Sequence, residues 1–107
     1  MIFRFGRFEL DDEAGELRRA GSPVEVQPKP LALLLLLVQQ RDRVVSSEEI
    51  FAALWPGVVV TPGSLTRAVS LARRAIEDHH RGEILRSVPR RGYRFSADVV
   101  ASEAPSG

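Results

Sequence analysis

The chain has 107 residues, of which 44% are apolar and 27% are charged, and this size and composition describe one ordinary globular domain and exclude a disordered protein. It contains no cysteine, which excludes disulfides, thiol catalysis and thiolate metal sites. The net charge of +1 is unevenly divided, because residues 1–62 carry −2 and residues 63–107 carry +3, and this asymmetry points to an anionic partner for the C-terminal half.

The first 26 residues predict a small antiparallel sheet. Four short runs have the composition of strands with one buried face: 2–5, 7–10, 16–19 and 24–26. Turn residues separate these runs, Gly21-Ser22-Pro23 among them. We interpret the acidic cluster Asp11–Glu13 as a solvated turn, because no histidine or further carboxylate pattern accompanies it. The opening residues lack the apolar segment of a signal peptide, so the expected compartment is the cytoplasm.

Residues 31–40 predict a helix, since prolines at 28 and 30 suit a first helical turn and leucine favours helices. This segment is apolar on nearly every side, so we expect it to be the central core helix. Its longest apolar run, Leu31–Val38, has eight residues. A membrane span needs about 18 to 20, so we expect no membrane contact by residues 1–107.

A second, short helix is predicted after Ser46-Ser47-Glu48-Glu49. This sequence fits a capping box, in which Ser46 accepts a backbone hydrogen bond and Glu49 reaches back. The helix runs to about Leu54, where Trp55-Pro56-Gly57 stops it. A short helix, a loop and a basic helix together form a helix-turn-helix-like pair, with a connection longer than the usual three or four residues.

The basic helix, within residues 61–76, is the element around which we expect the chain to be organised. At about 100° per residue its two faces differ, one being apolar and the other cationic and hydroxylated. The second face carries Thr66, Arg67, Ser70, Arg73 and Arg74. Guanidinium groups reach phosphates or guanine edges and hydroxyls bond to either, so this face suits a DNA major groove. The alternative is a solvated outer face, because charged exposed faces are ordinary.

Near the C-terminus, two strand-like runs flank the turn Pro89-Arg90-Arg91-Gly92. Adjacent arginines at a hairpin tip are unfavourable for stability but suit insertion into a minor groove or contact with phosphates. Glycine suits position 92 because it adopts a positive φ readily. We therefore expect a domain over residues 1–97 and a flexible tail or linker over residues 98–107.

The order of these motifs resembles the winged helix-turn-helix effector domain of bacterial two-component response regulators, over residues 3–97. The resemblance rests on four segments: Val44-Val45-Ser46, Leu54-Trp55-Pro56, Leu65-Thr66 and Val88–Phe95. The last segment is most similar to the branch that reads DNA without a phosphorylatable receiver domain. The resemblance implies an α+β fold with a four-stranded N-terminal antiparallel sheet, three helices and a C-terminal β-hairpin wing.

The resemblance also implies a site and its partners. The third helix, about residues 63–78, would enter the major groove through Thr66, Arg67 and Ser70. The wing, residues 89–92, would touch the minor groove or the backbone. The other members of the implied DNA-binding site are Arg73, Arg74, Arg90, Arg91, Arg94, Ser46, Ser47 and Trp55. The loop 55–62 corresponds to one that some family members use to meet RNA polymerase, and single domains of this type often bind tandem sites, which allows a homodimer on DNA.

We therefore predict sequence-specific binding of double-stranded DNA by the effector module of a bacterial transcription regulator. We expect no enzyme activity, no cofactor and no metal, since Gly-rich phosphate loops and Gly-x-Ser-x-Gly are absent. His79-His80 resembles a ligand pair, but adjacent residues diverge on a helix, and complementing the helix dipole is the expected role. The alternative is a winged helix for protein–protein contact, which would be expected to lose the paired wing arginines.

Overall fold

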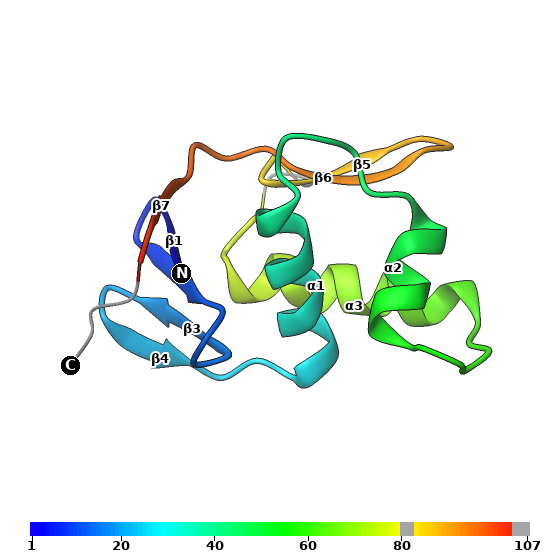
Figure 1. The fold of residues 1–107 in the computed structure, drawn as a ribbon, viewed down its shortest axis with the longest axis horizontal. Coiled ribbons are helices and arrows are strands. Elements are labelled where there is room, and N and C mark those ends of the chain that lie inside the picture. Colours follow the sequence, from blue (N-terminus) through cyan, green and yellow to red (C-terminus); the bar gives the residue numbers. More distant parts are fainter. Residues whose placement is uncertain (80–82, 104–107) are drawn as a thin grey trace.

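A computed structural model describes residues 1–79 and 83–103 of the chain. His80 of the predicted His79-His80 pair and residues 104–107 of the predicted tail lie outside this part. Figure 1 shows a sheet at one end of the molecule, a group of three helices beside it, and a β-hairpin that crosses the top of the helices. The fold is α+β, as predicted.

The sheet is an antiparallel meander of the four N-terminal strands with one C-terminal strand added. Its strands are β1 (Ile2–Phe5), β2 (Phe8–Asp11), β3 (Glu16–Arg19), β4 (Ser22–Val24) and β7 (Val100–Ser102). They lie in the order β4-β3-β2-β1-β7, and every neighbouring pair is antiparallel. Alternate side chains of β1 and β2, such as Phe3 and Leu10, are buried beneath the sheet.

Strand β7 differs from the prediction of a flexible tail beginning at residue 98. Val100–Ser102 pairs with β1 in the register Ile2↔Ser102, and Arg4 Nη1 donates to Ser102 Oγ at 2.9 Å. The physical reason is the outer edge of β1, where unpaired backbone groups can accept one more strand. The sheet therefore has five strands where four were expected.

The turn between β3 and β4 also lies earlier than predicted. Ala20 and Gly21 both adopt a positive φ, of 50° and 83°, as in the tight turns that suit β-hairpins. Strand β4 begins at Ser22, whereas the sequence predicted a turn over residues 21–23. Pro23 suggested a turn, but β4 is an edge strand of the sheet, and proline is tolerated in edge strands.

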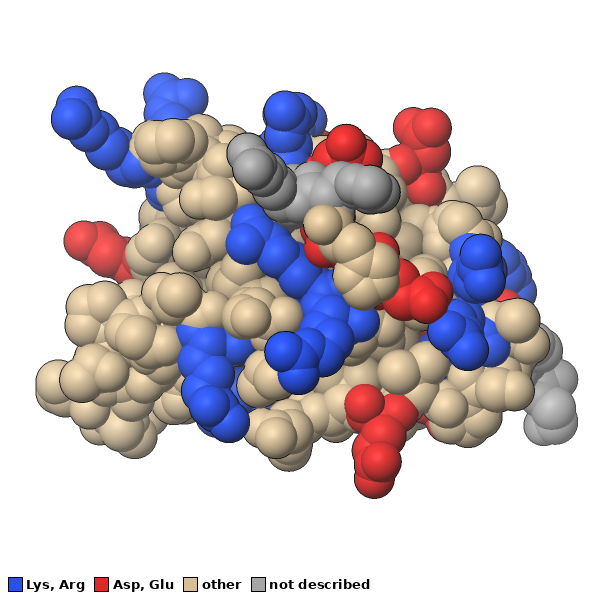
Figure 2. Space-filling model, turned by 180° about the vertical axis from the view of Figure 1, so that it is seen from behind, with Lys and Arg blue, Asp and Glu red and all other residues tan. Residues whose placement is uncertain are grey.

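The three helices and the wing follow in chain order. Their bounds are α1 (Pro28–Gln39), α2 (Ser47–Leu54), α3 (Pro62–Ala75), β5 (Leu85–Val88) and β6 (Gly92–Phe95). Helix α3 passes behind α1 in Figure 1 and so lies on the side that Figure 2 shows. It ends three residues before the predicted position 78, because Glu77 adopts a left-handed φ of 56°. Within residues 1–79 and 83–103, no helix has the length and hydropathy to span a membrane.

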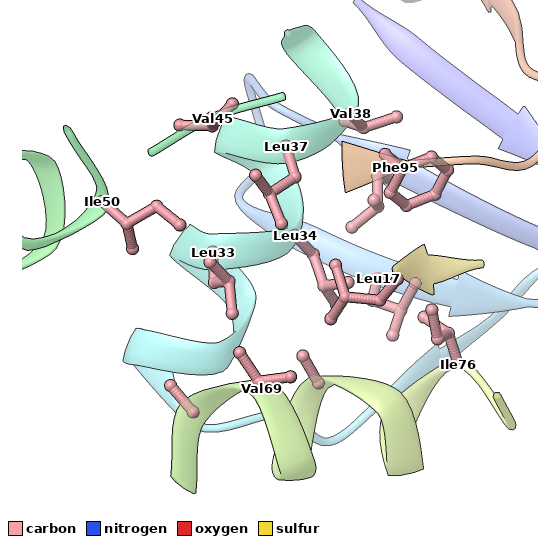
Figure 3. Packing of buried hydrophobic residues seen from close by; sticks show 14 of the residues in the cluster. Leu17, Leu33, Leu34, Leu37, Val38, Val45, Ile50, Val69, Ile76 and Phe95 are labelled. Carbon is pink, nitrogen blue, oxygen red and sulfur yellow. The ribbon is translucent and has the colours of Figure 1, made fainter. Parts of the chain in front are cut away.

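Helix α1 is the central core helix, as predicted. Leu33, Leu34 and Leu37 have no exposed surface. Figure 3 shows α1 between Ile50 of α2, Val69 of α3 and the pair Leu17 and Phe95. Its buried side packs against the other helices, the sheet and the wing, and Leu35 and Leu36 on the remaining side are half-buried.

Candidate nucleic-acid interface

The two faces of α3 differ as the periodicity predicted. Leu65, Ala68, Val69 and Ala72 are buried, and the small alanines let α3 lie close to its neighbours. Four side chains of the predicted site are exposed on the other face: Thr66, Arg67, Ser70 and Arg74. Two guanidinium groups and two hydroxyls are thus presented on one outer surface of a helix.

Arg73, the fifth predicted residue of this helix, lies differently. Its side chain is half-buried, and its Nε and Nη2 donate to the backbone carbonyl of Leu85 at 3.1 and 2.9 Å. The guanidinium is therefore directed at the first residue of β5. The structure separates Arg73 from the exposed group and gives it a protein partner.

The wing is the hairpin of β5 and β6, and it is joined to the chain that precedes α2. Val45 and Tyr93 exchange two backbone hydrogen bonds, of 2.8 and 2.9 Å. Gly92 has a φ of +143°, and a Cβ at this position would lie 2.0 Å from the carbonyl oxygen of Val45. The positive φ predicted for Gly92 is confirmed, but the close approach of two backbones is a second reason for glycine there.

The tip of the wing consists of Pro89, Arg90 and Arg91. The amide of Arg91 donates to the carbonyl of Val88 at 3.0 Å, and Arg90 has a φ of 65°. Proline followed by a residue with positive φ is the pattern of a type II turn, in which glycine normally takes the second place. An arginine in this conformation costs about 1 kcal/mol. Both arginines are exposed.

Two clefts connect these elements. A groove of about 390 Å³ between α3 and the wing is lined by Thr66, Ser70 and Arg74 on one side and by Ser87 and Tyr93 on the other, and the half-buried Arg73 also lines it. A cleft of about 440 Å³ between the start of α2 and the wing tip is lined by Ser46, Ser47, Glu48, Arg90 and Arg91 among others. The structure thus brings the helix, the wing and the two serines of the predicted site together.

The start of α2 is capped by Ser46, whose Oγ accepts from the amide of Glu49 at 3.1 Å. This half of the predicted capping box is confirmed. The carboxylate of Glu49 instead binds the Arg43 guanidinium at 2.7 and 3.1 Å, and this hydrogen bond lowers the pKa of Glu49. Because the Ser46 hydroxyl serves the helix, Ser47 is the serine of this pair that is better placed for a ligand.

Three residues of the predicted site line neither of these clefts: Trp55, Arg67 and Arg94. Trp55 and Arg67 border a separate hollow that Lys29 also lines. Trp55 is half-buried against Phe51, with ring centroids 5.7 Å apart, and the Lys29 ammonium lies 5.8 Å from its ring. Arg94 is opposite Arg86 in the wing ladder. Because side chains alternate along strands, Arg94 points to the face opposite Tyr93, which lines the groove.

Several arginines of α3 and the wing have no carboxylate partner among the described residues. Within residues 1–79 and 83–103, no ion pair involves Arg67, Arg74, Arg86, Arg90, Arg91 or Arg94. Glu77 pairs with Arg19 at 2.9 Å, and Asp78 is buried. Figure 2 shows basic side chains across the middle of the α3 side of the molecule and at its upper left, where the wing tip lies. Arg86 was not in the predicted site, although its position opposite Arg94 follows from the hairpin register.

Comparison with known proteins gives one family and several relatives. A family described as "Transcriptional regulatory protein, C terminal" matches residues 21–95. The transcriptional regulator HilA of Salmonella typhi is 29% identical over 104 residues, which cover 97% of this chain and 19% of HilA. The transcriptional activator CadC of Escherichia coli is 24% identical over 101 residues, which cover 92% of this chain and 20% of CadC. The chain spans about a fifth of the length of these curated relatives.

Two solved structures are similar in fold. The DNA-binding domain of E. coli CadC matches with a TM-score of 0.77 and 24% identity, over 92% of this chain and 94% of that one. The DNA-binding domain of Klebsiella pneumoniae RstA, solved in complex with the RstA box, matches with a TM-score of 0.73 and 19% identity, over 89% of this chain and 96% of that one. The predicted winged-helix fold is confirmed.

Proposed function

Because the chain belongs to the family of C-terminal domains of transcriptional regulatory proteins, we propose that it binds double-stranded DNA sequence-specifically as the DNA-binding module of a bacterial transcription regulator. A domain with this role acts in the cytoplasm. The observation that carries the proposal is a set of exposed arginines on α3 and the wing tip that have no carboxylate partner within the described residues. Arg74 lines the groove between α3 and the wing, Arg90 and Arg91 line the cleft at the wing tip, and Arg67 lies on the exposed face of α3. The RstA domain, which has the same fold, was solved with DNA.

In this proposal α3 lies in the major groove with its exposed face toward the base edges. Arg67 supplies a fork that matches the acceptors of guanine, and Thr66 and Ser70 supply hydroxyls that donate or accept. Each good base contact discriminates against a wrong base by about 1–3 kcal/mol. Specificity therefore depends on these three residues more than on the rest of the site.

Phosphate contacts supply most of the affinity. Arg74 lines the groove between α3 and the wing, and Ser47 at the start of α2 lines a second cleft together with the wing arginines, so α3, α2 and the wing each offer donors to phosphates. If about four to six phosphates are neutralised, log K falls against log salt with a slope of roughly −4 to −5. The wing tip adds contacts in the minor groove or on the adjacent backbone.

The proposal is tested by fluorescence anisotropy with a labelled mixed-sequence duplex at several salt concentrations. We expect wild-type protein to bind with a steep salt dependence. The variant Arg90→Ala/Arg91→Ala should bind roughly 10- to 100-fold more weakly, with a slope shallower by about 1.8, or 0.9 for each phosphate lost. Circular dichroism should show that the variant is folded, because both residues are exposed. Absence of wild-type binding at low salt would contradict the proposal. If the protein binds, selection from a random DNA library would identify the operator.

We further propose that the loop 55–62 meets RNA polymerase when the module is bound to DNA. Val58 and Val59 in this loop are 60% and 101% exposed, and adjacent exposed valines favour contact with a partner protein. The variant Val59→Asp should lower activated transcription in a purified system and leave the DNA affinity unchanged. Equal transcription from both proteins would exclude this role for Val59.

We also propose that two copies bind tandem DNA sites. Sedimentation of the protein with duplexes that carry one or two operator copies should give complexes with one and two protein chains. A single chain on the two-copy duplex at saturating concentration would contradict this.

A further inference from the structure

Leu85, the first residue of β5, is held through its backbone by two side chains from the end of α3 and the turn after it. Its amide donates to Asp78 Oδ2 at 2.9 Å, and its carbonyl accepts from Arg73 Nε and Nη2 at 3.1 and 2.9 Å. Leu85 itself has no exposed surface. We call Arg73, Asp78 and the Leu85 backbone the Leu85 clamp.

The clamp lies on the outer edge of β5. The amide of Ser96 donates to the carbonyl of Ile84 at 2.7 Å, so Ile84 is the residue whose backbone faces β6 at this level. Because hydrogen-bonded and non-hydrogen-bonded pairs alternate in an antiparallel ladder, the amide and carbonyl of Leu85 point away from β6. Arg73 and Asp78 therefore satisfy the groups that a further strand would otherwise pair with.

The hairpin is thus held at both edges. On the β6 side, Tyr93 is bonded to the backbone of Val45, before α2. On the β5 side, it is bonded to α3 through Arg73 and to the turn after α3 through Asp78. Asp78 also accepts from the amides of Glu83 and Ile84, at 3.1 and 3.2 Å. The clamp is a direct side-chain link between the helix proposed to enter the major groove and the wing.

We propose that Arg73 is a positioning residue for DNA binding, which acts by fixing the wing against α3 through Leu85. This inference rests on the proposed function. Helix and wing must reach separate parts of the duplex at once, and a wing that is ordered before binding loses less entropy on the DNA. Arg74, which follows Arg73 in the helix, is exposed where Arg73 is half-buried, and it provides the phosphate contact.

The test compares Arg73→Gln with Arg74→Gln, two variants that each remove one charge at adjacent positions of α3. Binding to one duplex is measured over a range of salt concentrations. We expect Arg73→Gln to bind roughly 10-fold more weakly with the wild-type slope of log K on log salt. We expect Arg74→Gln to have a slope shallower by about 0.9, because it loses a phosphate contact. Amide hydrogen exchange should accelerate over 85–88 and 92–95 in Arg73→Gln alone.

Two outcomes would overturn the inference. A slope shallower by about 0.9 in Arg73→Gln, with unchanged exchange in the wing, would show that Arg73 contacts a phosphate. An unchanged dissociation constant in folded Arg73→Gln would show that the clamp only stabilises the fold. If Arg73→Gln does not fold, the test uses Arg73→Lys, which keeps the charge but has one compact donor group. Arg73→Lys should bind DNA more weakly than wild type, with the wild-type slope. Wild-type affinity in Arg73→Lys would overturn the inference.

The failure of the proposed function is distinguishable from these results. If the wild-type protein does not bind DNA at low salt, the DNA-binding proposal fails before any variant is compared. The hydrogen exchange of the wing in Arg73→Gln would still report whether Arg73 holds β5.

Discussion

The sheet and the wing differ in whether their arginines lie opposite carboxylates. In the sheet, Arg4 and Arg18 lie on either side of Glu9 in the strand register, and Arg18 also contacts Glu16 at 2.7 Å. In the wing, Arg86 lies opposite Arg94, an arrangement of like charges that destabilises a strand pair. Arg4 and Arg18 are thus paired with carboxylates of the sheet itself, whereas Arg86 and Arg94 have no carboxylate partner among the described residues. The function of an arginine here depends on where the carboxylates are placed.

The sheet and the wing also differ in how closely their glycines approach other parts of the chain. Gly15 of the sheet has a φ of +63° with open space around it. In the wing, Arg90 has a positive φ without being glycine, and Gly92 lies against the backbone of Val45. Ala20, in the turn between β3 and β4, also has a positive φ without being glycine, so this conformation is not confined to the wing. The wing differs in the close contact of Gly92 with a second backbone segment.

The largest expected effect is that of Gly92→Ala. The new Cβ would overlap the carbonyl of Val45 at a φ where side chains are strained, so the free energy of unfolding should fall by about 3 kcal/mol. Gly15→Ala is the matched sheet variant, with a positive φ and no overlap, and should lose only about 1 kcal/mol. Urea denaturation measures both. Equal losses would show that the contact with Val45 is unimportant, and Gly92→Val should be at least as damaging as Gly92→Ala.

The next effect compares two pairs of arginines with the same total charge. Arg4→Ala/Arg7→Ala removes two exposed sheet arginines and should weaken DNA binding less than about 3-fold, because only long-range, screened attraction is lost. Arg90→Ala/Arg91→Ala should weaken it roughly 10- to 100-fold. Anisotropy titration at one salt concentration suffices for this comparison. Similar losses in the two variants would mean that net charge, and not the wing, determines affinity.

A smaller effect is expected from Arg90→Gly. Glycine adopts the φ of 65° without strain, so the variant should be more stable than wild type by about 1 kcal/mol. It should bind DNA more weakly, because the guanidinium is lost. Thermal melting and anisotropy on the same samples would show the opposite signs. A destabilised Arg90→Gly would contradict the strain assigned to the wing tip.

The smallest effect on stability is expected from Arg86→Glu, which places a carboxylate opposite an arginine in the wing, as Glu9 is placed in the sheet. Glutamate opposite Arg94 should raise the free energy of unfolding by about 0.5 kcal/mol. Arg86→Gln is the control, since it removes the repulsion without adding attraction and should give an intermediate value. The gain should decline in high salt, because these side chains are exposed. A gain that is insensitive to salt would have another cause.

Local patterns predicted much of this fold and of the candidate site. The 3.6-residue period of α3 separated buried Leu65 and Val69 from exposed Arg67 and Ser70 before any contact was known. The apolar run of α1 indicated the core helix, and Ser46 indicated the start of α2. Arg90 and Arg91 were recognisable because a hairpin tip is exposed by geometry. These features depend on residues a few positions apart, and such interactions are present in the sequence itself.

The remaining features depend on partners that are distant in the sequence. Arg73 and Arg74 are the same residue type at adjacent positions, yet Arg73 is bonded to a carbonyl 12 positions later. Trp55 packs against Phe51, with Lys29 over its ring, and neither contact was predicted from the sequence. Val100–Ser102 was expected to be flexible and pairs with β1, and a side-chain bond there spans 98 positions.

The sequence by itself determined the order of the elements, the apolar and cationic faces of α3 and the exposed arginines of the wing, because each follows from composition and short-range periodicity. The family was indicated by the resemblance of its motifs. Only the tertiary structure decided how the arginines of α3 and the wing are directed. Arg73 bonds to a protein carbonyl, Arg74 lines the groove, and Arg94 points away from it. The physical reason is that a guanidinium is directed by the nearest acceptor and a strand side chain by its register, and both are set by chain segments that meet only after folding.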